Sequence, residues 1–127
     1  FKAINDVHGH QTGDEVLRAV AHTLSRARIP HRVVIGRLGG EEFGILLDGE
    51  PSHALPLAEQ LRLTIAHLPI AVAGHSLSIT ASFGIATARE DYTWTRLYKL
   101  ADEALYRAKA SGRNLVLVSS GELSNAA

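Results

Sequence analysis

The sequence predicts one domain of the mixed class, α/β (α+β), in which helices pack on a sheet rich in antiparallel strands. Stretches with apolar residues at helical spacing alternate with β-branched or strictly alternating stretches. Glycines separate neighbouring strand-like stretches and suit tight hairpin turns. The 127 residues are enough for one core, and contents of 46% hydrophobic and 20% charged residues are ordinary for a globular chain.

The first half of the chain predicts a helix followed by a β-hairpin. Apolar residues recur at helical spacing over about residues 14–27, with Asp14 as the expected N-cap and Pro30 ending the helix. The stretches "RVVIGR" and "EEFGILL" then predict two strands joined by a tight turn at Gly39 and Gly40.

The second half predicts two further helices and three strands. Leucines and an isoleucine at helical spacing indicate a helix over about 57–68. The stretches "IAVAGH" and "LSITASFGIAT" predict a strand pair around a turn at Gly74. A third amphipathic helix follows, with Gly112 as its C-terminal cap, and "LVLV" at 115–118 predicts a last buried strand.

This order becomes the ferredoxin-like pattern β-α-β-β-α-β if one strand is added before Phe1, with an extra hairpin and a C-terminal helix. We therefore interpret the chain, which does not begin with methionine, as part of a longer protein. The domain is expected to cover residues 1–118, and residues 119–127 are expected to form a flexible tail. Because this topology serves many functions, the fold alone does not decide the activity.

Composition excludes several functional classes. The net charge is zero with neutral histidines, so no global field attracts nucleic acid, and we expect no nucleic-acid partner. The absence of cysteine excludes disulfides and cysteine-based zinc sites, and the seven histidines lack zinc-ligand spacing. No apolar run approaches the ~20 residues of a membrane span, and no signal peptide is visible, so we expect no direct membrane contact by this domain.

Polar side chains gather in "FKAINDVHGHQTGD", before the first predicted helix. An amide such as that of Asn5 and a carboxylate such as that of Asp14 can together read the Watson–Crick edge of guanine. On spacing alone, the N-cap role remains the favoured interpretation of Asp14.

Two further sets of charged residues have alternative interpretations. Lys109 and Arg113 end the third helix, where they can either interact with the helix dipole or bind phosphate, and the residues alone do not decide. Glu41 and Glu42 follow the hairpin glycines, where a solvated hairpin tip is the common arrangement. Mg²⁺, however, is held by one or two carboxylates together with substrate phosphates, so the pair is also a candidate metal site.

Four stretches, "FKAINDVHGHQTGDEVL", "RLGGEEF", "SFGIA" and "ADEALYRAKASGRN", resemble in order and spacing the motifs of the GGDEF domain, the catalytic domain of diguanylate cyclases. The resemblance runs from Phe1 to about Val118. It implies a ferredoxin-like palm of the nucleotidyl cyclase type. It also implies a bacterial signalling enzyme that works in the cytoplasm and is fused to a sensory or regulatory domain. Whether the longer protein is anchored in a membrane is left open.

The resemblance implies a role for each candidate at the hairpin. Glu41 matches the metal ligand and general base toward the ribose 3′-hydroxyl, and Glu42 matches a second contact to metal or substrate. Gly39 and Gly40 let the backbone approach the nucleotide. The implied metal is Mg²⁺, with Mn²⁺ as an alternative.

The remaining candidates are implied to bind GTP. Asn5 and Asp14 match the guanine-reading pair, and Leu17 lies where the family packs against the base. The residues that match phosphate contacts are Lys2, Lys109 and Arg113.

The implied reaction joins two GTP molecules into cyclic di-GMP and releases two pyrophosphates. Because each domain binds one GTP, the implied active form is a homodimer of two GGDEF domains. The alternative is an inactive GGDEF module that binds GTP and regulates a neighbouring domain.

The sequence departs from the family pattern in two places. A metal-binding aspartate precedes "FK" in the family, and the chain begins after that position, so we expect residues 1–127 alone to be inactive. The Arg-x-x-Asp of a product-inhibition site aligns with Pro30 and Val33, so that site is expected to be absent. Arg62 matches a secondary arginine of this site and is otherwise interpreted as a surface residue.

Overall fold

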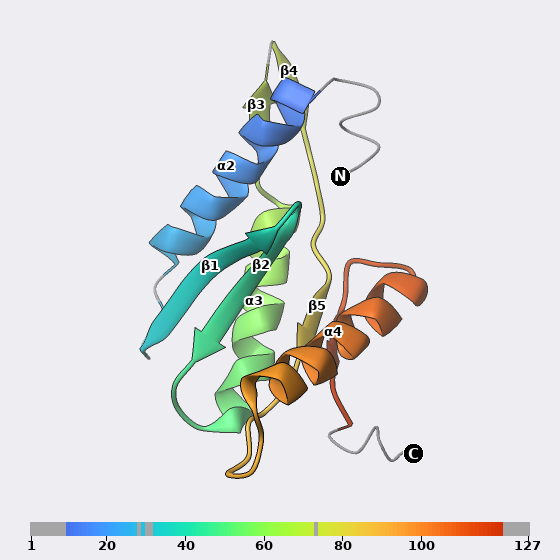
Figure 1. Ribbon diagram of the computed structural model, residues 1–127. Coiled ribbons are helices and arrows are strands. Elements are labelled where there is room, and N and C mark those ends of the chain that lie inside the picture. Colours follow the sequence, from blue (N-terminus) through green and yellow to red (C-terminus); the bar gives the residue numbers. More distant parts are fainter. Residues whose placement is uncertain (1–9, 28, 30–31, 73, 121–127) are drawn as a thin grey trace. The chain divides into compact units, whose positions relative to one another are not determined.

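A computed structural model describes residues 10–27, 29, 32–72 and 74–120 of the chain (Figure 1). The order of helices and strands follows the predicted one, except that three strands instead of two lie between the second and third predicted helices. The elements are α2 (His10–Arg26), β1 (Val33–Gly39), β2 (Glu42–Leu47), the short 3₁₀ helix η1 (Pro51–His53), α3 (Ala54–Ala66), β3 (Ile70–Val72), β4 (His75–Leu77), β5 (Phe83–Ile85), α4 (Trp94–Ala110) and β6 (Val116–Val118).

The chain divides into two compact units, and each is described by itself. The first unit comprises Phe1–Gly49 and Thr64–Ile79, and the second comprises Glu50–Leu63 and Thr80–Ala127. Within the described residues, the strands form the antiparallel pairs β1–β2 and β3–β4 and the parallel pair β5–β6. The predicted mixed class, with antiparallel hairpins and packed helices, is therefore confirmed.

In the first unit, α2 packs against β3 (Figure 1). Val16 on α2 is 1% exposed and forms a buried cluster with Ile70 and Val72 of β3. Apolar side chains on one face of an amphipathic helix supply this contact, as the helical spacing predicted.

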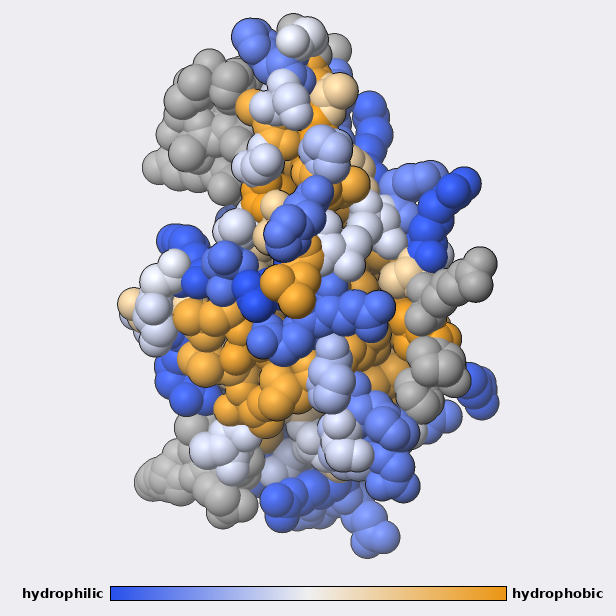
Figure 2. All heavy atoms as spheres, turned by 180° about the vertical axis from the view of Figure 1, so that it is seen from behind, coloured by the Kyte–Doolittle hydropathy of each residue, from blue (hydrophilic) through white to orange (hydrophobic). Residues whose placement is uncertain are grey.

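The hairpin β1–β2 pairs Val33 with Leu47 at its open end and Arg37 with Phe43 near its turn. The outward cross-strand pair of Val34 and Leu46 is 66% and 46% exposed. The hairpin therefore carries apolar side chains that its own unit does not bury. On the face seen from behind in Figure 2, hydrophobic surface is also exposed between hydrophilic side chains.

In the second unit, β5 packs against α4, and β6 lies beside β5 (Figure 1). The hydroxyl of Thr93 accepts a hydrogen bond from the Arg96 amide at 3.1 Å and caps the start of α4. Ala104 and Ala108, which are fully buried, form the inner face of the helix. Small side chains at these positions let a strand approach the helix closely.

Two predicted boundaries were wrong. Helix α2 begins at His10, so Asp14 is its fifth residue and not its N-cap. Thr12 is 9% exposed and lies one turn before Val16, so the inner face of the helix continues through a polar residue that the hydrophobic pattern does not detect. Helix α3 begins at Ala54, earlier than about residue 57, because Pro56 is tolerated in the first turn of a helix.

The single strand predicted over "LSITASFGIAT" was also wrong. This stretch contains the last residue of β4, Leu77, and the whole of β5, and the two strands belong to different pairs: β4 pairs with β3, and β5 pairs with β6. Residues 78–82 between them form no strand. Alternation along one segment predicts extended backbone, but the pairing partner of each half is set by residues distant in the sequence.

Gly112 ends α4 much as predicted. Ser111 is the C-cap, and Gly112 follows it with a φ of 117°.

In the described part of the chain, no helix has both the length and the apolar character needed to cross a bilayer.

Candidate nucleotide site at the glycine hairpin

A pocket of about 440 Å³ lies in the first unit between α2 and the hairpin β1–β2. Its volume is within the range of small-molecule sites in proteins. The residues that line it are Asp14, Leu17, Arg18, Ala21 and Ser25 of α2, and Ile35, Gly36, Arg37 and Phe43 of the hairpin. Two of the residues predicted to bind the base, Asp14 and Leu17, thus line the same pocket.

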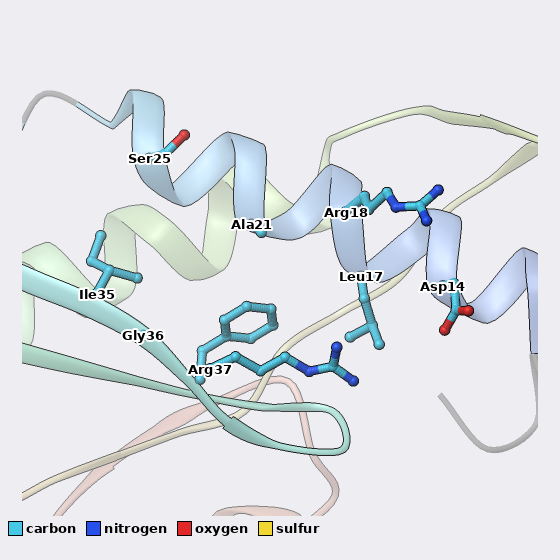
Figure 3. Close-up of a pocket in the computed structure, with 9 residues that line it drawn as sticks. Asp14, Leu17, Arg18, Ala21, Ser25, Ile35, Gly36 and Arg37 are labelled. Carbon is cyan, nitrogen blue, oxygen red and sulfur yellow. The ribbon is translucent and has the colours of Figure 1, made fainter.

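Helical spacing places the pocket-lining residues of α2 on the face of the helix that is directed toward the hairpin. Asp14, Leu17 and Ala21 are separated by three and four positions and therefore share one side of the helix. Figure 3 shows Leu17 pointing from α2 toward the hairpin, with the Asp14 carboxylate on the same side. Leu17 is 8% exposed, whereas Asp14 is exposed, so the pocket has an apolar wall and a carboxylate at one end.

The Arg37 side chain connects this pocket to the hairpin turn. Its Nε and Nη2 both donate to the carbonyl oxygen of Gly40, at 2.8 and 2.5 Å. Figure 3 shows the guanidinium of Arg37 lying below Leu17. Two donors on one carbonyl fix the orientation of the peptide that joins Gly40 to Glu41.

The turn itself requires its glycines. Gly39 and Gly40 have φ values of 151° and 51°, which a residue with a side chain rarely adopts. Glu41 lies in the turn and is exposed, and Glu42 is the first residue of β2 and is half-buried. The glycines therefore place two consecutive carboxylates at the tip of a hairpin whose geometry is held by Arg37.

These two carboxylates suit a hard divalent cation. The described residues include no group of three or more His, Cys, Asp or Glu side chains placed to hold a metal. One or two carboxylates with substrate phosphate oxygens are the usual protein ligands of Mg²⁺, so the donor set fits this ion.

Two of the cationic side chains predicted to bind phosphate belong to the second unit. Lys109 is in the last turn of α4 and is half-buried, and Arg113 is exposed just beyond the helix. Both residues lie at the C-terminal end of α4, where positive charge interacts favourably with the helix dipole. Lys2 and Asn5 lie outside the described residues.

The sequence reading missed Arg37, Arg18 and Phe43 as pocket residues. A signal for Arg37 was present, because it stands two positions before the glycine turn in "RLGG". The hydrogen bonds to Gly40 run back across the turn, however, and only folded coordinates reveal them.

The chain is similar to known proteins along almost all of its length. Residues 1–115 match the family model described as the diguanylate cyclase GGDEF domain. The chain is 44% identical over 115 residues to the diguanylate cyclase DgcP of Pseudomonas aeruginosa, covering 90% of this chain and 17% of DgcP. It therefore spans about a sixth of that relative's length.

Solved structures have the same fold. The GGDEF domain of DgcB from Caulobacter crescentus, solved in complex with c-di-GMP, matches with a TM-score of 0.83 and 33% identity over 92% of this chain and 70% of that one. Diguanylate cyclase SiaD from Pseudomonas aeruginosa, solved with its activator SiaC, matches with a TM-score of 0.85 and 37% identity over 93% and 45%. Together with the four motifs and the glycine hairpin, these matches establish that the chain belongs to the GGDEF domain family, the family of the diguanylate cyclases.

Proposed function

We propose that this domain condenses two GTP molecules into cyclic di-GMP and releases two pyrophosphates. The observation that carries the proposal is the pocket between α2 and the hairpin, because Asp14 and Leu17 line it and Arg37 joins it to the turn before Glu41. Base recognition and phosphate chemistry would then take place at the two ends of one cavity.

Guanine recognition rests on Asp14 and Leu17 in this proposal. The exposed carboxylate of Asp14 accepts hydrogen bonds from guanine N1–H and N2–H₂, and Asn5 supplies the complementary amide. Leu17 presents an apolar surface to the face of the base. Asp14 lies inside α2 and is not its N-cap, which supports this role because the carboxylate is not needed to cap the helix.

Phosphoryl transfer is assigned to the hairpin. The 3′-oxygen of one GTP forms a bond to the α-phosphorus of the other, the bond to the β-phosphate bridging oxygen breaks, and pyrophosphate leaves. Glu41 accepts the proton of the 3′-hydroxyl, and Glu42 helps to hold Mg²⁺ or Mn²⁺. When bound, this cation neutralises phosphate charge and polarises the α-phosphate. Lys2, Lys109 and Arg113 neutralise the remaining phosphate oxygens.

A second GGDEF domain is the partner that the reaction needs. Each domain presents one nucleotide, and two successive bonds close the ring, so a two-fold dimer places each 3′-hydroxyl against the other α-phosphate. A regulatory domain or partner would then act by controlling how these two domains meet. SiaD, which is similar to this chain, was solved with its activator SiaC.

The test is the production of cyclic di-GMP from GTP and Mg²⁺ by the full-length protein, measured by chromatography. The Glu41→Ala variant should lose at least a hundredfold of this activity, since one metal-binding and proton-accepting group is worth several kcal/mol. Glu50→Ala is the matched control, because Glu50 is an exposed glutamate whose side chain forms no cap hydrogen bond.

The same experiment separates the enzyme from the inactive, GTP-binding module. A wild-type protein that binds GTP without forming cyclic di-GMP at any protein concentration would contradict the proposed activity and support the regulatory module. Activity retained by Glu41→Ala would contradict the assignment of the proton acceptor.

A further inference from the structure

We propose that Arg62 is a positioning residue for nucleotide binding, because it holds in place the turn that carries Arg113. The inference rests on the proposed function, in which Arg113 contacts phosphate. All the contacts that support it lie within the second unit. From the sequence alone, Arg62 was interpreted as a secondary arginine of a product-inhibition site or as a surface residue.

The turn after α4 has an unusual backbone. Gly112, Arg113 and Asn114 have φ values of 117°, 64° and 53°, so three consecutive residues lie in the left-handed region. Glycine adopts this region without cost and asparagine tolerates it, but an arginine rarely does. Such a conformation persists only where the surrounding contacts determine it, and it often occurs where a side chain has a function.

Several hydrogen bonds hold this turn. The Arg113 amide donates to the Ala108 carbonyl at 3.0 Å, which ties the turn to the last turn of α4. The Asn114 amide donates to the hydroxyl of Ser82 at 3.1 Å, which ties it to the residue before β5. Both bonds use the backbone of the turn and leave the guanidinium of Arg113 at the surface.

Arg62 of α3 supplies the side-chain contact. Its Nη1 donates to the Asn114 Oδ1 at 3.0 Å and lies 3.4 Å from the Asn114 carbonyl oxygen. Its Nε donates to Glu59 Oε1 at 2.8 Å, one turn earlier on the same helix. The Arg62 side chain is 18% exposed, so it is held between a carboxylate and the turn and does not extend into solvent.

This arrangement links helix α3 to the direction of Arg113. Glu59 fixes the guanidinium of Arg62, and Arg62 fixes the side chain and backbone of Asn114, which adjoins Arg113. Without the contacts from Arg62 to Asn114, residues 113 and 114 can leave the left-handed region, and the Arg113 side chain then takes another direction. Arg62 thus acts on the nucleotide through Arg113 and does not touch it.

The test is the affinity of the full-length protein for 3′-deoxy-GTP with Mg²⁺, measured by calorimetry below the unfolding temperature. This analogue lacks the attacking hydroxyl, so binding is measured without turnover. Arg113→Ala should raise Kd by at least about tenfold, as expected for a lost charged hydrogen bond. Arg62→Gln should raise Kd about fivefold, and adding it to Arg113→Ala should raise Kd no further, because both act through one contact.

Two variants serve as controls. Glu59→Gln removes the charge of the ion pair, but its amide oxygen can still accept the hydrogen bond from Arg62 Nε and hold the guanidinium, so its Kd should stay within about twofold of the wild type. Asn114→Gly removes the Oδ1 acceptor while glycine still adopts a positive φ, so its Kd should rise like that of Arg62→Gln, and it decides the matter if Arg62→Gln does not fold.

The outcomes distinguish this inference from the proposed function. An unchanged Kd in Arg113→Ala would overturn the phosphate contact and the inference with it. A raised Kd in Arg113→Ala with an unchanged Kd in Arg62→Gln or Asn114→Gly would overturn the positioning role alone. Additive effects in the double variant would also overturn it, because Arg62 would then act independently of Arg113.

Discussion

Replacing Gly84 with alanine should destabilise the domain, because β5 and α4 touch through backbone at this point. An ideal Cβ on Gly84 would lie 2.9 Å from the Cα of Leu105 and closer still to the Leu105 amide nitrogen and the Ala101 carbonyl oxygen. Carbon atoms in contact are comfortable at about 3.5–4.0 Å, so α4 would have to withdraw from β5 by about 0.6 Å or more.

The expected cost follows from what cannot move. Overpacking a core costs about 1–3 kcal/mol, and the upper end applies here because the atoms in the way are backbone and have no other rotamer. Alanine loses about 0.4–1 kcal/mol less backbone entropy on folding than glycine, which offsets part of this. The net loss in the free energy of unfolding should be about 2 kcal/mol or more, which lowers Tm by about 8 °C in a domain of this size.

Urea unfolding and a thermal scan of the full-length protein measure this loss, with Gly36→Ala as the matched control. Gly36 is also in a strand, an added Cβ there meets nothing within 4 Å, and its φ is not in the left-handed region. The control should change the free energy of unfolding by less than about 0.5 kcal/mol. A Gly84→Ala protein as stable as the control would show that α4 does not pack on β5 through this backbone contact.

Three further predictions concern the site. Arg37→Lys should lower cyclic di-GMP synthesis at least about tenfold while changing the free energy of unfolding by under ~1 kcal/mol, because lysine cannot direct two fixed donors at the turn carbonyl; unchanged synthesis would refute this. Asp14→Asn should lower the preference for GTP over ATP about tenfold without loss of helicity by circular dichroism, and an unchanged ratio would remove Asp14 from guanine recognition. Pro30 and Val33 stand where the family's product-inhibition site has an arginine and an aspartate, and Arg62 contacts Asn114, so cyclic di-GMP should not bind near β1 with a sub-micromolar Kd. Calorimetric binding of that strength that is lost in Arg62→Ala would contradict this prediction.

The mixed class, most of the element order and the hairpin could be predicted from the sequence because they depend on local information. Apolar spacing set the inner face of α2, and consecutive glycines marked a turn whose φ values of 151° and 51° exclude most other residues. The same local reading misplaced the start of α2, since Thr12 is buried by packing although its hydroxyl is polar.

The candidate site was predictable in part. The motifs identified Asp14, Leu17, Glu41 and Glu42, and the roles of these residues remain predictions. Arg37 was not identified, because its bond to the Gly40 carbonyl depends on the register of the hairpin.

The sequence by itself determined the family, the helical and extended segments and the residue types available for phosphate and base chemistry. Only the tertiary structure decided that β4 and β5 belong to different strand pairs, that one pocket joins Asp14 to Arg37, and that Arg62 holds Asn114. The reason is physical: local spacing and backbone preference act over a few residues, whereas the Arg62–Asn114 contact joins residues 52 positions apart. Contacts of that kind exist only after the chain has folded and brought distant residues together.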